Sequence, residues 1–157
     1  MNKIDVIGGS GFIGSRLMRR LMVNNGRIKI IDKLPSKDFP DLAVLGDVRS
    51  IDQLRINISE QSIIINLAAE HRDDIQPLSL YDDVNVGGAE NICTVAREKD
   101  IRMVIFTSSV AVYGFAPIGT EESGKIAPFN DYGRTKYEAE QIFKAWQAEA
   151  PTERTLV

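Results

Sequence analysis

The stretch KIDVIGGSGFIG (residues 3–14) decides the fold. Its first part, KIDVI at residues 3–7, is a short apolar run rich in β-branched residues, which is typical of a strand buried on both faces. Its second half carries a G-x-x-G-x-x-G spacing made by three glycines: Gly8, Gly11 and Gly14. Without a Cβ these residues let the backbone turn sharply and come close to a ligand. A strand that ends in such a turn and opens a helix is the first unit of a doubly wound α/β sheet.

The same alternation of strand-like and helix-like segments continues along the chain. Further apolar runs predict strands at residues 27–31, 62–66 and 101–106, a minor strand at 42–47, and the start of another in ERTLV at 153–157. Helical spacing predicts a first helix with a stripe formed by Ile13, Leu17 and Leu21, ended by Gly26. It also predicts a short helix at 51–57 capped by Ser50, and longer helices at 81–99, softened by Gly87 and Gly88, and at 132–146.

This order of elements predicts an α/β fold, a doubly wound parallel sheet of the Rossmann type, formed by one domain over residues 1–157. The chain stops within its last apolar run, and an unpartnered apolar strand exposes an edge. We therefore expect residues 1–157 to be a dinucleotide-binding domain cut from a longer protein, without most of a C-terminal substrate domain.

Composition narrows the class of protein. With 157 residues, 43% hydrophobic and 26% charged, the chain is in the ordinary globular range. The net charge of -3 disfavours a protein that coats nucleic acid or anionic lipid. No apolar run approaches the roughly 20 residues of a membrane span. The single cysteine, Cys93, excludes an internal disulfide. No group of histidine, cysteine and carboxylate residues has the spacing of metal ligands. We expect a cytoplasmic protein with no metal, no membrane partner and no nucleic-acid partner.

The glycine turn and the end of the second strand together predict a dinucleotide site. The helix that begins near Gly11 offers free N–H groups and a positive dipole end to a pyrophosphate. Asp32 ends the second strand, where a carboxylate can accept hydrogen bonds from ribose hydroxyls and repels a 2′-phosphate. NAD is therefore favoured over NADP, although Lys33 and Lys37 could bind the 2′-phosphate of NADP. After the third strand, Asp47 and Val48 lie where a carboxylate could meet the adenine amino group.

The segment NDYGRTKYEAE (residues 130–140) places Tyr132 one helical turn before Lys136. By spacing alone, a chance pair on a surface helix is the simpler interpretation. The alternative is a phenol prepared for acid/base chemistry by a neighbouring cation. A free phenol titrates near pH 10, and bringing its pKa to about 7 takes about 4 kcal/mol, which an ammonium and an oxidised nicotinamide could supply together.

Taken together, these segments resemble the extended short-chain dehydrogenase/reductase superfamily, in its group of NAD-dependent sugar epimerases and dehydratases. The resemblance spans nearly the whole chain in order and rests on GGSGFIG, Asp32, GDV at 46–48, NLAA at 66–69, NVGG at 85–88, SSVAVYG at 108–114 and YGRTK at 132–136. It implies that Tyr132 is the general acid/base, that Lys136 is its cationic neighbour and binds the nicotinamide ribose, and that Ser109 orients the substrate.

The resemblance also implies a cofactor-binding set. Its members belong to the glycine turn, to the ends of later strands and to one helix: Gly8, Gly11, Phe12, Ile13, Gly14, Asp32, Asp47, Val48, Leu67, Ala68, Ala69, Asn85, Tyr132 and Lys136. Asn85 is expected to hold the strand ends around the cofactor. His71, the only histidine, follows this cofactor-lining segment and could contact substrate, but a loop histidine without that role is the commoner case.

The resemblance favours a UDP-glucose 4-epimerase-like enzyme that transiently oxidises a carbon of a nucleotide sugar. Val110 and Ala111 stand where dehydratases of the group carry acidic residues, and neither can move a proton. Relatives carry a C-terminal substrate domain and are often homodimers, so we expect a homodimer of the whole protein and little turnover by residues 1–157 alone. Two alternatives stay open, an NAD(P)-dependent reductase of a non-sugar carbonyl and a dinucleotide-binding regulator without turnover.

Overall fold

A computed structural model describes residues 3–24 and 27–157. Its centre is a sheet of six parallel strands in the order β3-β2-β1-β4-β5-β6. The strands are β1 (Lys3–Ile7), β2 (Arg27–Asp32), β3 (Ala43–Leu45), β4 (Ile63–Asn66), β5 (Met103–Phe106) and β6 (Thr155–Leu156). The predicted doubly wound parallel sheet is confirmed, and the final strand that ERTLV predicts is present at the sheet edge.

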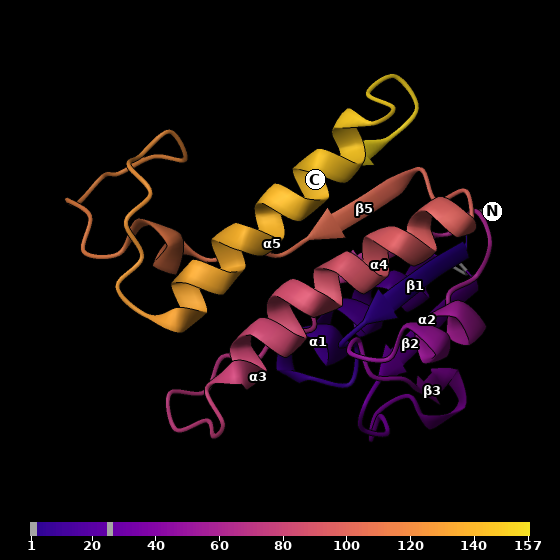
Figure 1. Ribbon diagram of the computed structural model, residues 1–157. Coiled ribbons are helices and arrows are strands. Elements are labelled where there is room, and N and C mark those ends of the chain that lie inside the picture. The colour runs from indigo at the N-terminus through magenta and orange to yellow at the C-terminus, as the bar shows by residue number, and fades with distance from the viewer. Residues whose placement is uncertain (1–2, 25–26) are drawn as a thin grey trace.

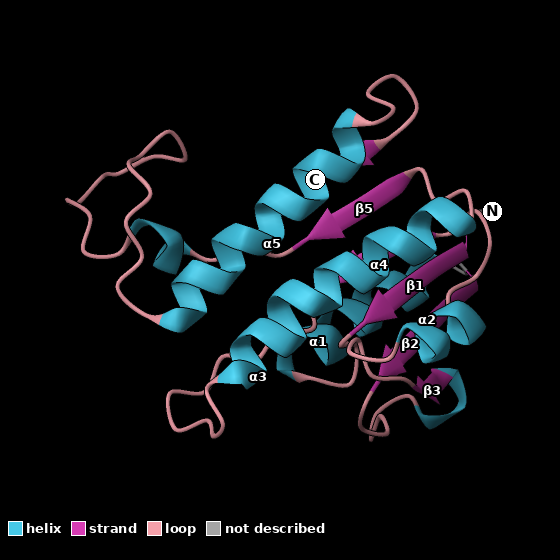
Figure 2. Ribbon diagram, viewed as in Figure 1, coloured by secondary structure: helices cyan, strands magenta, loops and turns pink. Residues whose placement is uncertain are grey.

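Helices cover both faces of this sheet. They are α1 (Phe12–Leu21), α2 (Ile51–Asn57), α3 (Ser79–Tyr81), α4 (Gly87–Glu98) and α5 (Asp131–Ala148), with a π-helical segment, η3 (Asp82–Val86), between α3 and α4. Figures 1 and 2 show α4 and α5 side by side across one face, with α1 behind the sheet. None of the helices in the described residues combines the length and hydropathy that a bilayer span requires.

Two apolar layers hold the helices to the sheet. The larger contains Leu54 of α2, Ile92 of α4, and Phe143 and Trp146 of α5, all fully buried, together with side chains from one face of the strands. The smaller packs Met18 of α1 against the opposite face. Continuous apolar strands are needed here because both faces of each central strand are covered.

The strand order reverses at β1, and this places the site. The chain runs outward from β1 to β2 and β3, and then crosses back to β4 on the other side of β1. The crevice outside the carboxyl ends of β1 and β4 is therefore left open, which is where ligands of such sheets bind. The segments that follow these strands, and the beginning of α5, converge on that crevice.

Several details differ from the sequence prediction. The buried face of α1 is formed by Gly14 and Met18, while Ile13 is largely exposed and points to the crevice, so the predicted stripe is wrong at its first position. The predicted end of this helix at Gly26 lies outside the described residues. The strand predicted from Ile101 begins at Met103, because the Ile101 N–H still donates to Ala96 and completes α4.

The long helix predicted over 81–99 is also different. It starts at Ser79, passes through the π-helical η3, and continues as α4 to Glu98. The departure from α-helical geometry precedes the glycines and does not lie at them. Gly88 serves close packing instead, since a Cβ there would come within 2.9 Å of the Val48 side chain. The predicted cap of α2 is confirmed, because Ser50 Oγ accepts a hydrogen bond from the Gln53 N–H.

Candidate functional site

A cavity of about 940 Å³ runs along the carboxyl ends of the central strands. One end is lined by the turn after β1 and the other by the start of α5, and residues far apart in the sequence meet in its wall. Of the predicted site residues, those that line it are Gly8, Gly11, Phe12, Ile13, Gly14, Asp32, Asp47, Val48, Leu67, Ala68, Ala69, Tyr132 and Lys136. Two predicted residues, Ser109 and Asn85, do not. The volume is within the usual range for a small-molecule site.

The turn after β1 needs its glycines for close approach. Gly8 has φ +78°, and a Cβ on it would lie 2.6 Å from the Ala68 backbone nitrogen. A Cβ on Gly14 would lie 2.5 Å from the Gly9 backbone, so the first turn of α1 rests directly on the glycine turn. Gly11 precedes α1 with no side-chain cap, and the helix therefore presents free N–H groups to the cavity.

Asp32 ties the end of β2 to this turn. One carboxylate oxygen accepts from the Ser10 N–H at 2.9 Å and the other from the Leu34 N–H at 3.0 Å. Each oxygen keeps a second lone pair that a ribose hydroxyl can use. Lys33 and Lys37 line the same cavity, so the cations that weaken the preference for NAD are present at this end.

Asp47 is held by its neighbour Arg49. The guanidinium donates to both carboxylate oxygens, at 2.6 to 3.1 Å, and this hydrogen bonding lowers the pKa of Asp47. The Asp47 N–H donates to the side-chain oxygen of Gln53. Asp47 is therefore an ionised, well-oriented acceptor at the edge of the cavity, next to the buried Val48.

Tyr132 and Lys136 bring α5 into the opposite end of the cavity, and both line its wall. Lys136 is only 2% exposed, and its ammonium lies 4.1 Å from the centre of the Phe106 ring. Burial lowers the pKa of Lys136 to about 8, against the opposing effect of the Glu140 charge. The ammonium is thus a partly desolvated cation facing the same space as the Tyr132 phenol.

The hydroxyls after β5 divide into two groups. Thr107 and Ser108 line the cavity. Ser109 precedes a short 3₁₀ turn, η4 (Val110–Tyr113), and its Oγ accepts from the Ala111 N–H at 3.2 Å. Accepting this bond leaves the Ser109 proton free to be donated elsewhere. Ser108 donates instead to Glu140 on α5.

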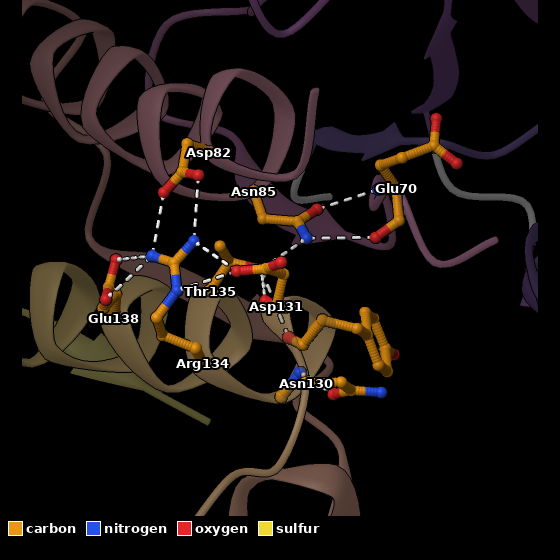
Figure 3. A network of polar contacts seen from close by, with 10 residues as sticks. Glu70, Asp82, Asn85, Asn130, Asp131, Arg134, Thr135 and Glu138 are labelled. Carbon is orange, nitrogen blue, oxygen red and sulfur yellow. Dashed lines mark hydrogen bonds and ion pairs between the residues drawn. The ribbon is translucent and has the colours of Figure 1, made fainter. Parts of the chain in front are cut away.

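A network of polar side chains joins α5 to the segment after β4 (Figure 3). The buried Asn85 carboxamide accepts from the Glu70 N–H at 2.8 Å and donates to the Glu70 carbonyl at 3.0 Å. The same amide donates to Thr135 Oγ1, which donates to the Asp131 carbonyl one turn back. Asn85 thus holds the cavity wall next to Ala69 without lining the cavity.

Arg134 supplies the second half of this network (Figure 3). Its guanidinium pairs with Asp82 in η3 and with Asp131 and Glu138 on its own helix, at 2.9 to 3.1 Å. At the beginning of α5, Asn130 accepts from the Gly133 N–H and caps the helix. These contacts hold the first turn of α5, and with it Tyr132, in one orientation.

Some residues of the site escape sequence reasoning. Ser10 is a small polar residue inside the glycine turn, so only the fold distinguishes it from its neighbours. Ser108 is next to the predicted Ser109, and only the fold shows that Ser108 is the one that lines the cavity. Gly133 left a clearer signal, a glycine in the first turn of a helix. A Cβ on it would lie 2.4 Å from the Ala111 carbonyl oxygen, so this glycine lets α5 rest against the turn after Ser109.

The chain is similar to known proteins over nearly its whole length. A sequence model described as "NAD dependent epimerase/dehydratase family" matches residues 4–156. The chain is 42% identical over 155 residues to the N-acetyl-alpha-D-glucosaminyl-diphospho-ditrans,octacis-undecaprenol 4-epimerase of Escherichia coli O157:H7, covering 99% of this chain and 46% of that protein. It is 32% identical over 152 residues to the UDP-glucose 4-epimerase of Rhizobium meliloti, covering 91% and 46%.

A solved structure of an epimerase has a similar fold over nearly the whole of this chain. The UDP-Glc/GlcNAc 4-epimerase of Campylobacter jejuni superposes with a TM-score of 0.88 at 25% identity, over 99% of this chain and 52% of that one. The chain spans about half the length of the relatives it matches. Because the family model covers nearly every residue, from the first strand to the last, the chain belongs to the NAD dependent epimerase/dehydratase family.

Proposed function

We propose that this chain is the dinucleotide-binding part of an NAD-dependent 4-epimerase whose substrate is a sugar carried on a diphosphate. The observation that supports this most is a single cavity with a glycine turn and Asp32 at one end and Tyr132 with Lys136 at the other. That arrangement separates a dinucleotide-holding half from a half that can move a proton. The UDP-glucose 4-epimerase of Brucella ovis, at 25% identity and a TM-score of 0.86, is described in complex with NAD.

The residues present fit NAD. The free N–H groups at the start of α1 would bind the pyrophosphate, and the close approach of Gly8 to Ala68 and of Gly14 to Gly9 leaves no room for side chains in the turn. The carboxylate of Asp32 would accept the adenosine ribose hydroxyls. The Lys136 ammonium would donate to the nicotinamide ribose. When bound, NAD supplies the oxidation and reduction of one sugar carbon.

The protein's own groups then handle the proton. Tyr132, with the Lys136 cation in the same cavity, takes the proton of the sugar hydroxyl and returns it after the sugar has presented its other face. Lys136 stabilises the negative charge of the phenolate. The Ser109 Oγ already accepts a hydrogen bond from Ala111. Ser109 would donate its own proton to the sugar oxygen and hold that oxygen in place, with the sugar extending past Ser108, which lines the cavity.

Two carriers of the sugar fit this proposal, a nucleotide and a polyprenol. The nucleotide carrier follows from the UDP-sugar relatives, and the polyprenol carrier from the relative at 42% identity, whose name specifies an undecaprenol-linked N-acetylglucosamine. Both carriers present the same diphosphate to the protein, so the proposal specifies a diphosphate-linked sugar and leaves the choice of carrier to the experiment.

The test has a binding stage and a turnover stage. Calorimetry on this chain is expected to show NAD binding that Asp32→Ala abolishes and Lys125→Ala, on a loop away from the cavity, leaves unchanged. The whole gene product is then given UDP-N-acetylglucosamine or undecaprenyl-diphospho-N-acetylglucosamine, and formation of the 4-epimer is followed by mass-coupled chromatography. Tyr132→Phe is expected to lower turnover by at least about a hundredfold, the usual range for losing an acid/base group. A chain that binds no NAD, or a Tyr132→Phe enzyme with full turnover, would contradict the proposal.

A further inference from the structure

The Lys136 ammonium is charged in surroundings that disfavour charge. Its side chain is buried, and its ammonium contacts the face of Phe106. Within residues 3–24 and 27–157, no hydrogen bond or ion pair from the ammonium to another residue is formed. A buried ammonium without such partners tends to lose its proton. A neutral Lys136 could not stabilise a Tyr132 phenolate, so something must oppose the loss.

Glu140 follows Lys136 by one helical turn on α5, which places the two side chains on the same face. Its carboxylate is fixed by two other groups: the hydroxyl of Ser108 donates to one oxygen at 2.5 Å, and the Lys144 ammonium approaches the other at 3.3 Å. Ser108 itself lines the cavity beside Lys136. The carboxylate is therefore drawn toward the cavity side of the helix, and it is the charged group that raises the pKa of Lys136.

Other ionisable groups also line or border this end of the cavity. Tyr132, on the same helix, is a phenol and not a carboxylate. From the segment after β4, Glu70 pairs with Arg72 at 3.3 Å, and His71 lies between them in sequence. β5 places the apolar ring of Phe106 against the ammonium. On α5 itself, Asp131 and Glu138 pair with Arg134, and Glu140 is the carboxylate one helical turn from Lys136 whose charge acts on its pKa.

We infer that Glu140 is a positioning residue of the active site: its carboxylate, anchored by Ser108, keeps the buried Lys136 ammonium protonated and directed into the cavity. The inference rests on the proposed function, because only a catalytic Lys136 needs its charge. It also gives Ser108 a role distinct from that of Ser109. Ser108 holds the carboxylate behind the cation, while Ser109 is left to meet the substrate.

The test measures the protonation of Lys136 directly. The chain is labelled with ¹³Cε-lysine, and the Lys136 resonance, assigned by its loss in Lys136→Met, is followed by NMR from about pH 6 to 11. Glu140→Gln is expected to lower the titration midpoint of Lys136 by about one pH unit, the effect of removing one opposite charge about one helical turn away. Ser108→Ala is expected to lower it by less, because the carboxylate stays but loses its anchor.

Glu138→Gln is the matched control, since it also removes an α5 carboxylate from an ion pair, the one with Arg134. It is expected to leave the midpoint unchanged. Equal midpoints in the Glu140→Gln and Glu138→Gln proteins would overturn the inference, and if Glu140→Gln does not fold, an unchanged midpoint in Ser108→Ala would do so. NAD binding by the wild-type chain is measured separately. Its absence would contradict the proposed function while leaving the lysine result standing, so the two failures can be told apart.

Discussion

Replacing Lys136 by Met is expected to make the folded protein more stable. Burial lowers the pKa of this lysine from 10.5 to about 8, and each pH unit corresponds to about 1.4 kcal/mol. Holding the charge in the folded state therefore costs about 3 kcal/mol at neutral pH. Methionine keeps an apolar stem of similar shape against Phe106 and carries no charge to desolvate. Loss of the cation–π contact offsets about 1 kcal/mol, which leaves a gain of about 2 kcal/mol.

The pH dependence gives this prediction its sign. Between pH 8 and 10.5 the unfolded chain still binds the Lys136 proton while the folded chain has released it, so the wild type gains stability as pH rises through this window. Below pH 8 the full cost applies. The Lys136→Met protein lacks this titration. The difference between the two proteins should therefore be largest at pH 7 and should have nearly disappeared by about pH 10.5.

Urea denaturation at several pH values measures both quantities by linear extrapolation. A gain of about 2 kcal/mol corresponds to a rise in melting temperature of roughly 4–8 °C for a domain of this size. Lys144→Met is the control, because Lys144 is on the same helix but largely exposed, and we expect it to change stability by no more than about 0.5 kcal/mol. A Lys136→Met protein that is less stable than the wild type at pH 7, or a difference that does not narrow at high pH, would refute the reasoning.

Three further predictions test other parts of the site. Gly14→Ala places a Cβ 2.5 Å from the Gly9 backbone, and we expect it to lower the free energy of unfolding by about 2 kcal/mol and NAD affinity at least tenfold. In the control, Gly11→Ala, the Cβ meets only the Gly8 carbonyl oxygen at 3.4 Å, so stability should change by less than about 0.5 kcal/mol. Equal urea midpoints for the two variants would count against close packing of this turn. Asp32→Asn should weaken NAD binding about tenfold and reduce the preference for NAD over NADP, because Lys33 and Lys37 remain in the cavity. Calorimetry with both dinucleotides measures the two affinities, and an unchanged ratio between them would disprove this prediction. Burial raises the pKa of Cys93 to about 12, so a thiol reagent at pH 8 should label it only as fast as the protein unfolds, and immediate labelling of the folded protein would show that the thiol is accessible.

The sequence by itself determined the architecture and the approximate place of the site. β1 was predicted with its observed bounds and β2 to within one residue, because buried parallel strands must be apolar on both faces and such runs are visible without a structure. The glycine turn, the place of Asp32 at the end of β2, the start of a helix near Gly11 and the cap at Ser50 were predicted for a similar reason. Each depends on local backbone geometry, which the residues impose through their own φ preferences and hydrogen-bonding groups.

Only the tertiary structure decided which side chains enter the cavity and what surrounds them. Helical periodicity marked Ile13 as a core residue, but the open end of the sheet leaves it at the cavity and buries Met18 instead. The family pattern favoured Ser109 over Ser108, but Ser108 is the one that lines the cavity. The sequence also could not show that Lys136 is buried against Phe106, or that Glu140, one turn further along α5, is bonded to Ser108. The physical reason is that desolvation and charge pairing depend on segments distant in sequence. A strand end, a loop and a helix must come together before a lysine becomes a buried cation with a lowered pKa.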